Sequence, residues 1–87
     1  MATLDEIREE QIRMLRLRLR VDLTCYRLRV ARLSREEAAA LIERTKQEIL
    51  DLFPEKEQVF ELVLRPRFER ILQERAWAEW GVADSLN

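Results

Sequence analysis

The sequence has no histidine and only one cysteine and one glycine among its 87 residues. Without histidine, no imidazole can act as a general base or orient a nucleophile. One cysteine is too few for a zinc site, and one glycine is too few for a P-loop or a dinucleotide-binding fingerprint. A carboxylate-only site for Mg²⁺ or Ca²⁺ stays open, but the chain has no EF-hand-type loop. We therefore expect a protein that is not an enzyme and that has no cofactor and no catalytic or metal-binding residues.

Long apolar runs are also missing, so no segment resembles a membrane-spanning helix, and the first residues do not resemble a secretory signal. Apolar residues make up 47% of the chain and charged residues 38%, a balance typical of a folded globular domain. The length fits one domain over residues 1–87. We interpret the lone Cys25 as a small buried residue rather than a reactive thiol or a disulfide to a partner chain, and expect a cytoplasmic protein.

Most of the chain consists of residues that favour α-helices. Residues 4–33 contain neither Gly nor Pro, and Thr3 and Glu6 have the spacing of a capping box. Residues 15–24 alternate between apolar and polar as a half-buried strand would. Leucine and arginine favour a helix, however, and the chain offers no second strand to pair with. We therefore predict a first helix over about residues 4–32.

The capping residues, the prolines and the glycine predict two further helices. Ser34 and Glu37 form a second capping box, which predicts a helix over about residues 35–53. Pro54 is well placed to begin a third helix, over about residues 54–80, with Gly81 as a residue that ends it. Pro66 lies inside this helix and disfavours a helical conformation at the preceding Arg65, which predicts a kink or a break there. The fold class is therefore all-α, a three-helix hairpin or bundle with a long first helix and a third helix kinked at Pro66.

The first helix carries two apolar stripes about 145° apart, whereas a helix on the surface of a monomer needs only one. The first stripe consists of Ile12, Leu15, Leu19, Leu23, Tyr26, Val30 and Leu33. The second consists of Ile7, Met14, Leu17, Val21, Cys25 and Leu28. One stripe should pack inside the chain and the other against a partner. As the protein interface we name Met14, Leu17, Val21, Cys25 and Leu28, together with Trp77 and Trp80.

The length of the first helix also indicates a partner. A helix of this length spans about 43 Å, whereas a compact globule of this size is only about 30 Å across. The chain is therefore predicted to associate with itself, as an intertwined or coiled-coil-like homodimer or higher oligomer. Two alternatives stay open: a monomeric bundle whose other helices cover both stripes, and an obligate complex with a different protein.

Charge is segregated along the chain. Residues 11–35 hold eight arginines and one acid, and residues 36–64 hold eight acids and three bases. One interpretation is a phosphate-binding surface for nucleic acid, made by Arg13, Arg16, Arg20 and Arg27. The other is that the basic helix packs beside an acidic one, within or between chains. We favour the second because the acidic block is of similar size and immediately adjacent. Leucines, rather than the aromatic residues of single-strand binders, also separate the arginines.

The segment around Pro66 has two interpretations as well. Arg65 and Arg67 could clamp an anion at a helix break, or they could pair with glutamates one turn away along the helix. A membrane-surface helix fits poorly, because the first helix has two apolar faces and an acidic neighbour. The sequence thus predicts a small non-enzymatic interaction or assembly module, an adaptor, regulatory subunit or scaffold component, that binds itself and another protein. The alternative is a nucleic-acid-binding protein.

Overall fold

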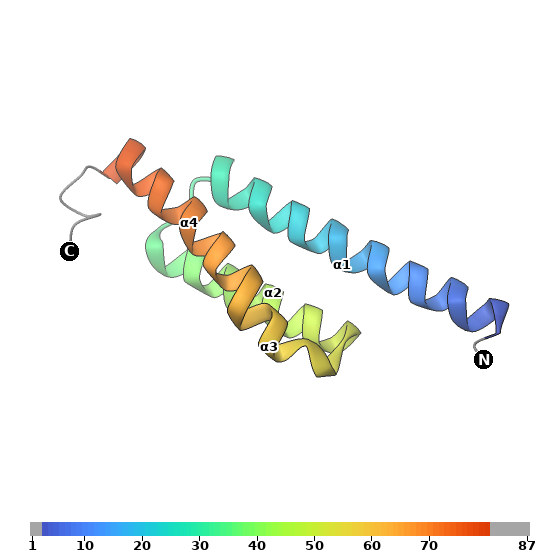
Figure 1. Ribbon diagram of the computed structural model, residues 1–87. Helices are drawn as coiled ribbons and strands as arrows, with labels where there is room; N and C mark the ends of the chain where they lie inside the picture. The colour runs from blue at the N-terminus through green and yellow to red at the C-terminus, as the bar shows by residue number, and fades with distance from the viewer. Residues whose placement is uncertain (1–2, 81–87) are drawn as a thin grey trace.

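The computed structural model describes residues 3–80, and every element in that range is helical (Figure 1). The long helices are α1 (Leu4–Val30) and α2 (Arg35–Leu52). A third helical segment then runs through η1 (Pro54–Lys56), α3 (Glu57–Val59), η2 (Phe60–Leu64), α4 (Arg65–Arg75) and η3 (Ala76–Trp80). The prediction of an all-α chain is confirmed for the described residues. Gly81 lies outside them.

Both predicted capping boxes form. The hydroxyl of Thr3 accepts a hydrogen bond from the backbone N–H of Glu6 at 3.1 Å, and the Glu6 carboxylate accepts one from the Thr3 backbone at 3.4 Å. Ser34 and Glu37 make the equivalent pair at 3.0 and 3.1 Å. The hydrogen bonds from the Ser34 backbone and hydroxyl lower the pKa of Glu37. These caps satisfy N–H groups that a helix leaves unpaired at its start, so they fix where α1 and α2 begin.

The chain stays helical through Pro66, and the expectation that this proline turns Arg65 away from helix is wrong. Arg65 has φ −58° and ψ −47°, which are ordinary α-helical values. The distortion lies one turn earlier, in η2, a π-helical turn in which the Arg65 N–H donates to the carbonyl of Phe60. A proline ring clashes with the carbonyl four residues before it. A wider turn before Pro66 accommodates that ring without ending the helix.

The helices pack as a three-segment unit around one core. In Figure 1, α2 runs back along α1, and the third segment then returns beside both. The core draws on all three and contains Val21, Cys25, Leu28, Ala38, Leu41, Ile42, Ile49, Phe60, Phe68 and Ile71. Phe60 and Phe68 are fully buried, with ring centroids 6.1 Å apart. Eight residues drift about 80° around a regular α-helix, so the wide turn between these two rings helps both to face the core.

Two buried threonines, one on α1 and one on α2, form a hydrogen bond between the two helices. Their hydroxyl oxygens, on Thr24 and Thr45, lie 2.8 Å apart, and the Thr45 hydroxyl also donates to the carbonyl of Leu41 at 2.8 Å. Thr24 is therefore the donor to Thr45. Both side chains are almost completely buried, and this chain of hydrogen bonds satisfies them.

The molecule is elongated, with principal extents of 55 × 22 × 16 Å. The guanidinium of Arg13 lies 5.3 Å from the ring centroid of Phe53, at the end of α2. The turns of α1 before Arg13 extend beyond the other helices (Figure 1). About a third of α1 is therefore uncovered by the rest of the chain.

Candidate protein-docking surface

The side of α1 that faces away from the core is apolar. We call this side the outer stripe, and it consists of Ile12, Leu15, Leu19, Leu23, Tyr26 and Val30. Each of these side chains is between 46% and 62% exposed. Single exposed apolar residues are normal on a protein, but a contiguous row of large ones marks a surface that binds something.

The helical geometry of α1 explains why this stripe is uncovered. Val21, Cys25 and Leu28 form the face that packs against α2 and α4. At about 100° per residue, Leu19 and Tyr26 lie on the opposite side of the helix from that face. The other helices of the chain therefore leave the outer stripe about half exposed.

The projecting turns of α1 expose both stripes. Ile7 continues the line of the core-facing stripe, yet it is 44% exposed because no other helix extends that far; Met14, level with the end of α2, is still 43% exposed. Leu4, near the start of α1, is 81% exposed. This end of the helix therefore lacks cover on its inner side as well as on its outer side.

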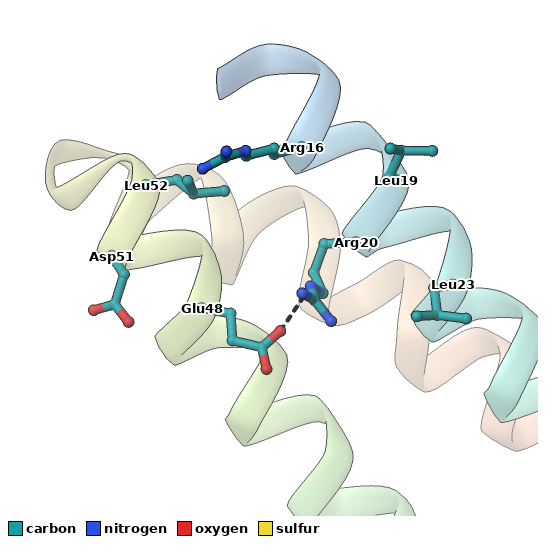
Figure 2. A pocket seen from close by; sticks show the side chains of 7 residues that line it. All are labelled: Arg16, Leu19, Arg20, Leu23, Glu48, Asp51 and Leu52. Atoms are coloured by element: carbon teal, nitrogen blue, oxygen red, sulfur yellow. Dashed lines mark ion pairs between the residues drawn. The ribbon is translucent and has the colours of Figure 1, made fainter. Parts of the chain in front are cut away.

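A groove of about 490 Å³ runs along one edge of the outer stripe, between α1 and the last turns of α2 (Figure 2). Leu19 and Leu23 line it on the α1 side, and Leu52 lines it on the α2 side. The Nε atom of Arg20 reaches across to a carboxylate oxygen of Glu48 at 2.8 Å, as the dashed line in Figure 2 shows. The groove thus combines apolar walls with charges of both signs, a composition that suits a protein partner.

The residues named from the sequence as the interface separate into two groups. Val21, Cys25 and Leu28 are buried in the core, and Leu17 is half-buried against it. Their burial counts against them as a partner surface of the folded chain, because α2 and α4 already cover them. Met14 and Trp77 are exposed, whereas the side chain of Trp80 lies outside what the structure describes.

The four arginines proposed for phosphate contact do not form a free basic surface. Arg13 pairs with Glu10, and Arg20 pairs with Glu48. Arg16 lies in the groove with Glu48 and Asp51, and Arg27 is half-buried. Carboxylates thus lie beside three of the four, and they would oppose a phosphate approaching from that edge.

Arg65 joins helices instead of forming an open clamp. It lies 2.7 Å from Glu43 on α2 and 2.6 Å from Glu61 one turn back, and its guanidinium lies 5.3 Å from the Phe60 ring centroid. Of the two interpretations of this segment, pairing with a glutamate at helical spacing is thereby confirmed for Arg65. Arg67 is exposed.

Glu61 is the centre of this ion-pair network. Besides Arg65 it binds Lys46 of α2, whose Nζ atom lies 2.7 Å from a Glu61 carboxylate oxygen. The hydrogen bonds from Arg65 and Lys46 lower the pKa of Glu61 to about 2. The same contacts raise the pKa values of Lys46 and Arg65. The network ties α2 to the third segment, so these charges serve the fold.

Arg75 is a structural residue that was not predicted from the sequence. Arg75 is only 9% exposed, and its guanidinium donates a hydrogen bond to the carbonyl of Leu28 at 3.1 Å. Leu28 lies in the last turn of α1, where helix carbonyls lack partners. A signal existed, because Arg75 follows Phe68 and Ile71 at helical spacing on the apolar side of α4.

The comparisons with known proteins add no relative: no family model, no curated protein and no solved structure matches the chain. Within residues 3–80, no helix is both long and apolar enough to cross a membrane. Nor do His, Cys, Asp or Glu side chains in this range gather in a group of three that could hold a metal ion.

Proposed function

We propose that this protein is a small protein–protein interaction module, an adaptor or assembly component, and that the outer stripe of α1 is its binding element. The observation that supports it is a row of large apolar side chains, each about half exposed, on the side of α1 that the chain cannot cover. Helix-in-groove and helix-on-helix recognition use such rows, with anchors three or four residues apart. The adjoining groove supplies charges that can orient the partner.

A site-specific cross-link tests this function. Leu19 is replaced by a photoreactive aromatic residue in the full chain, in the cells that make it. The matched control places the same residue at Gln47, which is exposed on α2. We expect one discrete protein adduct from position 19, identified by mass spectrometry, that disappears when Leu23→Asp is added. Equal labelling from positions 19 and 47 would contradict the proposal.

Nucleic-acid binding is the second candidate, and it rests on the eight arginines of residues 11–35. Backbone binding by these arginines predicts affinity for a generic duplex that falls steeply as salt rises. Fluorescence anisotropy of a labelled duplex at low salt tests it. No binding under those conditions would exclude this candidate.

A further inference from the structure

We infer that the occupant of the outer stripe is the outer stripe of a second copy of the same chain, with the two α1 helices packed antiparallel. This inference rests on the proposed function and names its partner. Three observations on α1 support it: the spacing of the stripe, the distribution of charge along the helix, and the uncovered turns at its start.

Between Ile12 and Tyr26, the spacing of the outer stripe is the same in either direction along the helix. From Ile12 through Leu15, Leu19 and Leu23 to Tyr26, the steps are three, four, four and three residues. In an antiparallel pair related by a two-fold axis, each residue on one side of the axis meets its counterpart on the other. With Leu19 at the axis, Leu19 meets Leu19, Leu15 meets Leu23, and Ile12 meets Tyr26. Every anchor from Ile12 to Tyr26 then has an apolar partner.

The charge of α1 favours the antiparallel direction over the parallel one. Residues 4–10 hold four acids and one arginine, and residues 11–32 hold seven arginines and one acid. A parallel pair would bring the acidic ends together and the basic ends together, which costs free energy. In the antiparallel pair, Glu9 comes level along the axis with Arg29 of the second copy, and Glu6 comes level with Arg32, just past the end of that copy's α1. The helix macrodipoles also oppose one another in this arrangement.

The same alignment covers some of the turns that the chain leaves bare. Around an axis at Leu19, residues 8–12 of one copy lie beside residues 26–30 of the other, the last residues of α1. Ile12 thereby approaches a neighbouring helix that its own chain does not supply. The stripe faces away from α2 and α4, so both copies keep their cores intact when they pair.

Single cysteines test both the pairing and its direction. The native Cys25 is only 3% exposed, so the unmodified chain serves as the background control. Leu19→Cys places two thiols at the two-fold axis, and we expect a disulfide-linked dimer under mild oxidation. In Tyr26→Cys the two thiols lie about 21 Å apart along an antiparallel pair, because each is seven residues from the axis. We expect at least tenfold less cross-linking there, whereas an equal mixture of Ile12→Cys and Tyr26→Cys should cross-link between the two variants.

Each contrary outcome identifies which statement fails. Efficient cross-linking of Tyr26→Cys to itself would indicate a parallel pair and overturn the inference. So would light scattering that shows a monomer of 10.5 kDa across a concentration series. If the chain is monomeric and position 19 still gives an adduct with a different protein in cells, only the second copy is wrong. If neither experiment yields an adduct, the proposed function fails as well.

Discussion

Glu61 is the residue at which a lysine of α2 and an arginine of α4 meet. Its two carboxylate oxygens accept hydrogen bonds from Lys46 of α2 and from Arg65 of α4. Surface ion pairs contribute little singly, but several charges that share one acceptor act as a network. Because Arg65 also reaches Glu43, the network spans two helices and stabilises the packing of the third segment on α2.

The pKa of Glu61 gives this network a pH dependence. Its folded-state pKa of about 2 is below the value of 4.5 expected for an unperturbed glutamate. The carboxyl group therefore contributes stability above about pH 4.5, and this contribution is lost as the pH falls toward 2. We expect Glu61→Gln to lower the free energy of unfolding at pH 7, and this deficit should shrink between pH 4.5 and pH 2. Urea denaturation of both proteins at several pH values measures it, and a deficit that does not change with pH would rule out the network.

At the scale of the element, the ends of the helices could be predicted from sequence because capping is local. Thr3 with Glu6 and Ser34 with Glu37 satisfy unpaired N–H groups within four residues, so the starts of α1 and α2 could be read directly. The wide turn in η2 could not. It depends on Pro66 and on the packing of Phe60 and Phe68 in a core that also draws on α1 and α2.

The outer stripe shows the same limit for the candidate site. The sequence of α1 has two apolar stripes of similar composition, and nothing within α1 indicates which of them α2 and α4 will cover. That choice is made by residues far along the chain, such as Phe68 in the core and Arg75, which binds the last turn of α1. The existence of two stripes was therefore predictable, whereas the exposed one was not.

The two capping boxes should differ in how much they stabilise the molecule. Ser34 begins α2, whose first turn includes the completely buried Ala38, so losing this cap disturbs the core. Thr3 begins the part of α1 that extends past the other helices. We expect Ser34→Ala to lower the free energy of unfolding by about 1 kcal/mol. Thr3→Ala should lower it by much less in the monomeric protein, where fraying of the first turns breaks no tertiary contact.

Urea denaturation gives the free energies of unfolding for the two capping variants, and circular dichroism gives their helix content. The two variants should be compared in a Leu19→Asp background, so that pairing with a second copy contributes to neither free energy of unfolding. Equal destabilisation by the two substitutions would mean that the first turns of α1 are tied to the core after all.

At the scale of the whole molecule, the shape reflects a helix that is longer than the core it packs on. The radius of gyration of the Cα atoms is 15.6 Å. A compact globule of this length would have a radius of gyration of about 12 Å. The difference comes from α1, which the other helices accompany for only part of its length.

Small-angle scattering of the Leu19→Asp variant tests this shape. The charged side chain lies on the outer stripe, so it should block pairing without entering the core. We expect a radius of gyration near 15.6 Å for that monomer. A value near 12 Å would show that the start of α1 folds back onto the other helices.

The hydrogen-bonded threonines between α1 and α2 have a consequence for how the hairpin settles during folding. The surrounding core side chains are apolar and make contacts without a fixed direction, whereas the hydrogen bond between the two hydroxyl groups forms in only one alignment of the helices. A slip would separate Thr24 from Thr45 and leave a hydroxyl against hydrocarbon, at a cost of about 1–3 kcal/mol. The hydrogen-bonded pair therefore favours one alignment of α1 along α2. Because the outer stripe lies on α1, this alignment also fixes the position of the stripe relative to the core.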